Sequence, residues 1–139
     1  MKNLISVILA IAILSIISCE NDKNDSINEN GFLKGTIGLY EGNCEPVATC
    51  QPSPISTTVA ITKPSQDFNM DLLVDSVITS ENGTFEIKLP EGNYSIFLRD
   101  GNEFICDSWT CPDDCYCTLI TIKNDSITTV TANIDHATW

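Results

Sequence analysis

Residues 84–98 read Thr-Phe-Glu-Ile-Lys-Leu-Pro-Glu-Gly-Asn-Tyr-Ser-Ile-Phe-Leu, and this stretch decides the fold. Apolar and polar residues alternate on both sides of a central Pro-Glu-Gly-Asn, which places every second side chain on one face of a strand. The residues on these two faces are Phe85, Ile87 and Leu89, and then Tyr94, Ile96 and Leu98. Proline and glycine supply turn chemistry between them, so the stretch predicts a β-hairpin.

The same alternation recurs from residue 31 onward, with turn-forming residues about every ten positions and no sustained helical spacing. We expect further strands at residues 33–40, 57–62, 72–79, 104–106, 118–122 and 126–135. Residues 42–56 contain three prolines and two cysteines and predict a long loop. About seven short strands predict an all-β fold, an antiparallel β-sandwich, in one domain at residues 31–139 with cysteine-rich loops.

The hairpin also carries a family resemblance. Residues 83–96 read G-T-F-E-I-x-L-P-E-G-x-Y-x-I, which resembles the hallmark hairpin of carboxypeptidase regulatory-like domains. Weaker agreement comes from residues 35–37 and 58–61. The resemblance implies a transthyretin-like (prealbumin-like) sandwich and a non-catalytic accessory, adhesion or carbohydrate-associated role on an exported protein. The cysteines before Leu119 depart from the usual pattern of that family.

The N-terminal segment predicts export and lipid anchoring. After the basic Lys2, residues 4–17 form an apolar run of about 14 residues, shorter than the about 20 that span a bilayer and within the range of secretory signals. The following Ile-Ile-Ser-Cys at residues 16–19 resembles the lipobox of bacterial lipoproteins. We therefore expect residues 1–18 to be a helical signal peptide that is removed, and Cys19 to be acylated and anchored in the lipid bilayer. An ordinary secretory signal with an incidental Cys19 is the alternative.

The segment behind Cys19 and the net charge limit the partners. Residues 19–30 are polar and acidic with almost nothing to bury, which predicts a flexible acidic tether. Acidic residues at this position resemble signals that send lipoproteins to the outer cell surface, although a plain solvated linker explains them equally well. The expected location is the bacterial cell envelope, at the outer membrane. A formal charge of −12, from nineteen acidic and seven basic residues, argues against nucleic acid as a partner.

Six cysteines remain once Cys19 is assigned to lipid, namely Cys44, Cys50, Cys106, Cys111, Cys115 and Cys117. An even number in an exported chain predicts disulfides, with fifteen connectivities open. We favour a bridge between Cys44 and Cys50, pairing among the other four, and different partners for Cys115 and Cys117. The alternative is a metal site built from Cys106, Cys111, Cys115 and Cys117 with His136, but the paired C-x-x-C spacing of structural zinc sites is missing. No metal or other cofactor is predicted.

No residue set predicts catalysis. The one histidine, His136, has Asp135 beside it, and neighbours on a strand point to opposite faces, so Asp135 does not orient the imidazole. The acidic pair Asp113 and Asp114 fits a solvated turn. No nucleophile elbow, zinc-binding helix or phosphate loop occurs in the sequence. We therefore expect a protein that is not an enzyme.

The tryptophans are the candidates for binding. Trp109 lies between Cys106 and Cys111, where an exposed indole stacks on a sugar ring or anchors a protein contact; the alternative is that it packs over the bridges as a small core. Trp139 is expected to cap the sandwich. The leading hypothesis is a surface-tethered binding module for an unidentified protein or carbohydrate. A metal-binding envelope lipoprotein and a structural protein that self-associates through sheet edges are the alternatives.

Overall fold

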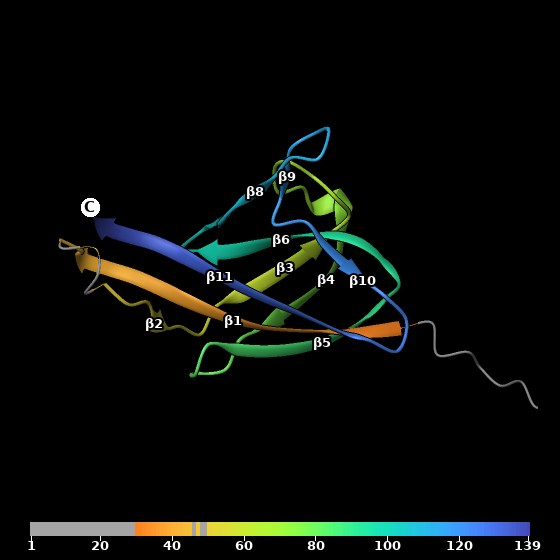
Figure 1. Cartoon of the computed structure of the whole chain (residues 1–139), viewed down its shortest axis with the longest axis horizontal. Coiled ribbons are helices and arrows are strands. Elements are labelled where there is room, and N and C mark those ends of the chain that lie inside the picture. Colours follow the sequence, from red (N-terminus) through yellow and green to blue (C-terminus); the bar gives the residue numbers. More distant parts are fainter. Residues whose placement is uncertain (1–29, 46, 48–49) are drawn as a thin grey trace, which may run out of the picture.

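The structure is a computed structural model that describes residues 30–45, 47 and 50–139 (Figure 1). The predicted signal peptide, the acylation site Cys19 and all but the last residue of the predicted tether lie outside the described residues. Asn30, which the sequence places in the tether, is instead the first residue of a strand. Within the described part of the chain, no helix is long and apolar enough to cross a membrane.

The first sheet is built around β1 (Asn30–Asn43). Strand β11 (Ile127–Thr138) pairs with one edge of β1 in parallel over twelve residue pairs. Along the other edge lie β5 (Thr84–Pro90) and then the short β2 (Ser53–Pro54), both antiparallel to β1. The prediction of purely antiparallel pairing is therefore wrong for β1 and β11. These two strands are joined through nearly the whole domain rather than by a hairpin, so their relative direction is free to be parallel.

The second sheet is built around β6 (Gly92–Asp100). Strands β3 (Thr58–Thr62) and β4 (Leu73–Ile78) extend it on one side, and a 3₁₀ turn at Met70–Leu72 precedes β4. Strands β7 (Glu103–Ile105) and β10 (Ile120–Ile122) pair with different parts of the other edge of β6. A separate hairpin consists of β8 (Trp109–Thr110) and β9 (Tyr116–Cys117).

Two boundaries differ from the sequence expectation. The expected strand at residues 118–122 begins only at Ile120, because Thr118 has a φ of 33°, which breaks the extended backbone before it. Residues 42–56 are not wholly a loop, since β1 continues to Asn43 and β2 forms at Ser53–Pro54.

The main core lies between the two sheets and confirms the predicted β-sandwich. Phe85 and Leu89 from β5 and Tyr94, Ile96 and Leu98 from β6 are buried and Ile87 is half-buried, which confirms both predicted strands and their inward faces. The prediction that these strands form a hairpin is wrong, because β5 pairs with β1 in the first sheet and β6 with β3 in the second, so the turn after Pro90 carries the chain from one sheet to the other. Other strands complete this core with Leu33, Ile37, Val59, Ile61, Ile120, Ile122, Ala132 and Ile134. Burying these side chains removes their apolar surface from water, which is the main stabilising contribution to such a domain.

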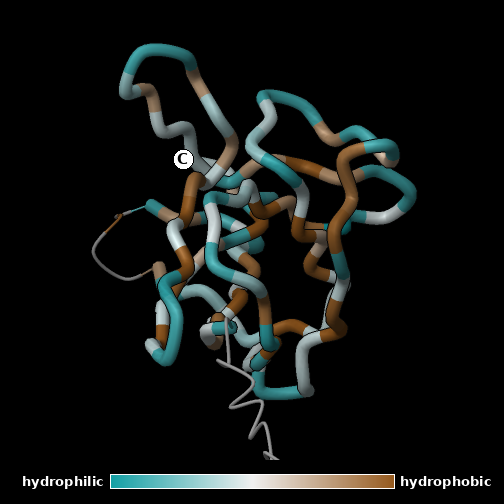
Figure 2. The backbone as a smooth tube through the Cα atoms, turned by 90° about the vertical axis from the view of Figure 1, so that its right-hand side faces the viewer, coloured by the Kyte–Doolittle hydropathy of each residue, from teal (hydrophilic) through white to brown (hydrophobic). Residues whose placement is uncertain are grey.

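The outer face of the second sheet is also covered. Ser95 and Phe97 alternate with the core residues of β6, yet both are buried. Phe97 packs with Ala60 and Cys117 in a second apolar cluster, against which Phe68, Phe104 and Cys106 lie. Figure 2 shows apolar residues on the strands of the body and hydrophilic residues on the loop that projects from the top. The cysteine-rich segment therefore acts as a partial third layer.

Candidate functional site

The cysteine-rich segment forms a projecting hairpin, which we call the disulfide-braced arm (residues 106–118). It rises above the body of the sandwich in Figures 1 and 2. A disulfide between Cys106 and Cys117 closes its base, and a second between Cys111 and Cys115 closes its outer loop. The third disulfide joins Cys44 to Cys50. These bridges confirm the predicted disulfides, the favoured pairing of Cys44 with Cys50, and different partners for Cys115 and Cys117.

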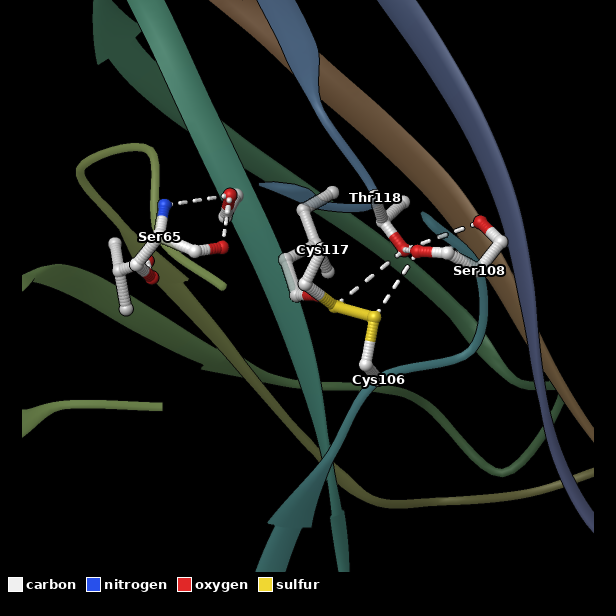
Figure 3. Close-up of a disulfide and its surroundings, with 8 residues drawn as sticks. Ser65, Cys106, Ser108, Cys117 and Thr118 are labelled. Atoms are coloured by element: carbon white, nitrogen blue, oxygen red, sulfur yellow. Dashed lines mark hydrogen bonds between the residues drawn. A yellow bond between two sulfur atoms is a disulfide. The ribbon is translucent and has the colours of Figure 1, made fainter. Parts of the chain in front are cut away.

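The base of the arm is fixed to the second sheet, as Figure 3 shows. Cys117 is fully buried, and its main-chain N–H donates to the carbonyl oxygen of Ser65 at 3.0 Å. The main-chain N–H of Ser65 in turn donates to Oγ of Ser95 on β6 at 3.1 Å. Within the arm, the N–H of Thr118 donates to the carbonyl oxygen of Ser108 at 2.8 Å. The base is thus held by a disulfide and by main-chain hydrogen bonds at the same place.

Trp109 is presented to solvent by this arrangement. It lies on β8 directly opposite Cys117, and 52% of its surface is exposed. The space under the bridges is filled by other side chains, Phe68 and Phe104, whose rings stack with centroids 4.1 Å apart. The alternative in which Trp109 forms that small core is therefore wrong. Asp113 and Asp114 are exposed in the outer loop, as the sequence predicted for a solvated turn.

A pocket lies between the two sheets at the end where β1 and β11 finish. It has a volume of about 490 Å³. Its apolar lining includes Leu39, Ile55, Ile78 and Ile134, and its charged lining consists of Glu41, Arg99, Asp100 and His136. Strand β1 begins at Asn30, which lies at the opposite end of the domain in Figure 1. A strand of fourteen residues is about 45 Å long, so this end is far from the predicted tether.

His136 is paired with an acid from the other sheet. Its Nε2 lies 2.7 Å from Oδ2 of Asp100, where β6 ends. This hydrogen bond and the negative charge of Asp100 raise the pKa of His136, and the carboxylates of Glu41 and Asp135 act in the same direction. The expectation that Asp135 does not orient the imidazole agrees with this pairing. Sequence reasoning missed Asp100, which is 36 positions away and carries no local signal.

Two of the hydroxyls that line the described pocket make hydrogen bonds to main-chain oxygens instead of to this pair. The hydroxyl of Ser56 donates to the carbonyl oxygen of Thr79 at 2.9 Å, and that of Thr57 donates to the carbonyl oxygen of Arg99 at 2.6 Å. Among the described residues, the imidazole of His136 has Asp100 as its hydrogen-bond partner. A Ser-His-Asp system needs a hydroxyl hydrogen-bonded to the histidine, and neither hydroxyl is used in that way.

Trp139 and Asp135 form a second polar and aromatic group at the same end. The indole Nε1 donates to Oδ2 of Asp135 at 2.9 Å, and the ring meets Tyr40 edge-on with centroids 5.6 Å apart. Trp139 stays 50% exposed, so it lies against β1 rather than covering the core. Burial raises the pKa of nearby Asp107, a main-chain hydrogen bond from Asn133 opposes this shift, and the charge of Asp135 reinforces it.

The cysteines proposed as an alternative metal site are used differently. Cys106, Cys111, Cys115 and Cys117 are all joined in disulfides, so their sulfurs are not thiolate ligands. In residues 30–45, 47 and 50–139, no group of three or more His, Cys, Asp or Glu side chains is placed to hold a metal ion. His136 lies with Asp100 at the end pocket rather than with the cysteines.

Comparison with known proteins finds no matching family model and no matching curated protein. Among solved structures, the chain is similar to a minor pilin of the Gram-positive pathogen Streptococcus agalactiae, with a TM-score of 0.48, 16% identity, and coverage of 78% of this chain and 45% of that one. It is also similar to the TIE protein of Bacillus anthracis, with a TM-score of 0.45, 16% identity, and coverage of 77% of this chain and 16% of that one. A DUF3823 family protein of Parabacteroides merdae is similar with a TM-score of 0.42, 18% identity, and coverage of 75% of this chain and 45% of that one. The chain spans less than half the length of these proteins. At this level of similarity they assign no function to it.

Proposed function

We propose that this protein is an exported, lipid-anchored and non-catalytic binding module that contacts its partner through Trp109. The observation that carries the proposal is a half-exposed indole on a hairpin closed by disulfides at its base and outer loop. Large aromatic side chains presented on a braced loop are frequent anchors of binding surfaces, where they contribute most of the binding energy. A braced arm loses little conformational entropy on binding, which favours affinity.

Export is supported by the three disulfides, because such bonds persist in oxidising compartments outside the cytoplasm. The lipobox-like residues 16–19 support anchoring through Cys19, and the resemblance of residues 83–96 to carboxypeptidase regulatory-like domains supports an accessory role. The acidic balance of the chain keeps the domain itself away from anionic lipid, so the acyl group is the membrane contact.

Anchoring is tested by growing producing cells with an alkyne-tagged fatty acid. We expect the tag to appear on the wild-type chain and to be absent from Cys19→Ser, which should also leave the membrane fraction. The matched variant Ser18→Ala keeps a small residue at the cut and should be tagged normally. An unlabelled wild-type chain that retains Met1 would contradict lipid anchoring.

Binding is tested in cells with the full chain carrying the photo-crosslinking residue p-benzoylphenylalanine in place of Trp109. We expect a discrete cross-linked adduct, and its mass and composition distinguish a protein from a glycan partner. The control places the same residue at Lys88, an exposed position on β5. The proposal fails if position 109 yields no adduct beyond those found at position 88.

A further inference from the structure

The end of the domain farthest from Asn30 carries a second aromatic group outside the arm. We call it the aromatic corner, formed by Tyr40 of β1, Asp135 of β11 and Trp139, which follows the end of β11. Tyr40 and Asp135 are neighbours in the parallel register of the two strands. Beyond Tyr40 on the same face of β1 comes Gly42, where an added Cβ would meet no atom within 4 Å. The corner therefore opens to solvent on this side.

Two rings meet at an angle in this corner. The planes of Tyr40 and Trp139 are inclined by 62° with centroids 5.6 Å apart. Half of the Trp139 surface remains exposed, so the contact with Tyr40 leaves much of the indole free. In this edge-to-face contact the free indole surface stays open to solvent, and the C–H bonds of a saturated six-membered ring pack against aromatic faces of this kind.

The indole is held in place before any ligand arrives. Oδ2 of Asp135 accepts the Nε1–H of Trp139 at 2.9 Å, while Oδ1 of the same carboxylate accepts the main-chain N–H of Ala137 at 2.9 Å. Both oxygens retain further lone pairs, because an ionised carboxylate accepts about four hydrogen bonds. The corner thus combines a fixed ring with unused acceptor capacity, and fixing the ring in advance lowers the entropic cost of binding.

Charge selects the class of ligand. The charge of Asp135 acts on the carboxyl group of Asp107 and raises its pKa, so two acids lie near the corner. These acids repel sulfated, phosphorylated or uronic sugars, as does the net charge of −12. Carboxylates also accept hydrogen bonds from hydroxyl groups. A protein partner would favour a corner surrounded by apolar side chains that exclude water. The aromatic corner is adjoined by acidic side chains and Gly42 instead.

We propose that the aromatic corner binds an uncharged sugar residue of a glycan, with the ring against Trp139 and Tyr40 and its hydroxyls donating to Asp135. This inference rests on the proposed binding function and names a ligand class for it. It uses a different surface from Trp109, so either proposal can fail without the other.

The test uses tryptophan fluorescence of the full chain purified from membranes in detergent. The chain has two tryptophans, so Trp109→Phe leaves Trp139 as the single reporter. The probes are cellohexaose, maltohexaose, xylohexaose, mannohexaose and chitohexaose, with hexagalacturonate as the anionic comparison. We expect a saturable change in Trp139 emission with at least one neutral probe and at least tenfold weaker binding of hexagalacturonate.

Variants of Tyr40 separate binding from folding. Tyr40→Ala removes one aromatic ring and should weaken binding of the responsive probe at least tenfold, whereas Tyr40→Phe keeps the ring and should bind within about twofold of its parent. Tyr116→Ala, on the arm, is the matched control and should leave binding unchanged. The proposal is overturned by no saturable response to any neutral probe, by preferred binding of hexagalacturonate, or by equal binding in Tyr40→Ala and Tyr40→Phe. Protein adducts at position 109 without any glycan response would leave the arm proposal standing and overturn this one.

Discussion

Gly35 has no room for a side chain. A Cβ atom at this position would overlap the ring of Phe85, its partner across β1 and β5, and would lie 2.9 Å from Cγ1 of Val130 on β11. The buried Phe85 ring thus occupies the space that any other residue would need at position 35. The glycine is required here by close approach between strands rather than by backbone conformation.

We expect Gly35→Ala to lower the free energy of unfolding by about 1–3 kcal/mol, the usual cost of forcing an extra methyl group into a filled core. Urea unfolding followed by tryptophan fluorescence measures it. Gly92→Ala is the control, since its nearest neighbour would be the Tyr94 hydroxyl oxygen at 3.3 Å and a smaller loss is expected. Equal stability of Gly35→Ala and the wild type would contradict the packing at this site.

His136 gives a second prediction at the residue scale. Its pKa is raised above the ordinary value of 6.5 by Asp100, so the pair stabilises the folded state fully below about pH 6.5 and ceases to do so as the pH rises through the folded pKa. Because the chain has one histidine, its ring proton resonances titrate without overlap from another. We expect an NMR midpoint above 6.5 that falls in Asp100→Asn. A midpoint at or below 6.5 in the wild type would refute the pairing.

The arm is the element whose stability depends most on a covalent bond. The disulfide between Cys106 and Cys117 spans eleven positions, and that between Cys111 and Cys115 spans four. Loop-closure entropy assigns them roughly 3 and 2 kcal/mol. Cys117 is also fully buried in the second apolar cluster, so its loss carries an additional packing cost.

We therefore expect the double variant Cys106→Ala/Cys117→Ala to lose more unfolding free energy than Cys111→Ala/Cys115→Ala. Guanidinium unfolding of both double variants beside the wild type provides the measurement. A larger loss on removing the outer bridge would show that the base of the arm does not depend on its disulfide.

Strand β4 has an exposed edge that is protected by an acidic side chain. It is an edge strand with exposed Leu73, Val74 and Ile78, the kind of edge that pairs with other chains. The main-chain N–H of Thr79 donates to the carbonyl oxygen of Thr57, just before β3. Because successive N–H groups along a strand point in alternate directions, the N–H of Ser76 points away from the sheet. Oδ1 of Asp75 accepts that N–H at 2.7 Å. The Asp75 carboxylate thus satisfies the outward N–H of Ser76 and places a negative charge on this edge.

We expect Asp75→Ala to increase self-association, because it frees an edge N–H and removes a charge beside three apolar residues. Analytical ultracentrifugation of the detergent-purified chain detects the change as a larger sedimenting species. Asp113→Ala alters the net charge equally at the arm and should sediment as the wild type does. If both variants behave alike, net charge rather than the edge governs association.

At the scale of the whole molecule, stability is concentrated where sheets are covered on both sides. Strands β1, β3 and β6 each have neighbours on both edges, and β6 is buried on both faces from Tyr94 to Leu98. The arm pairs over two residues on each strand and is mostly exposed. Its amides therefore exchange through their exposure to solvent, without opening of the core and without loss of the disulfide-braced backbone path.

Hydrogen exchange should therefore be slowest at the amides of β6 and of the middle of β1, and fast at residues 109–116 despite the two disulfides. Mass spectrometry of peptic fragments or NMR measures these rates. Exchange at residues 109–116 as slow as in β6 would mean that the arm is part of the cooperative core.

The local pattern of the sequence determined much of this architecture. Alternation and turn residues at 84–98 specify two strands, the turn between them and their buried faces, because side-chain direction along a strand depends only on neighbouring residues. That these two strands join different sheets instead of pairing as a hairpin was decided by their partners β1 and β3, which are distant in sequence. The short spacing of Cys44 and Cys50 is a local signal as well, and it favoured their bridge. Disulfides were predicted from an even count, although the pairing of Cys106 with Cys117 was one of several options.

Tertiary structure alone decided the parallel pairing of β1 with β11, the burial of Ser95 and Phe97, and the contact of His136 with Asp100. Each joins segments that are distant in sequence, so no local pattern specifies it. Whether the outward face of β6 meets water depends on where the arm folds back, and that follows from the packing of the whole chain. The aromatic corner likewise exists only because two strands from opposite ends of the domain lie side by side in register.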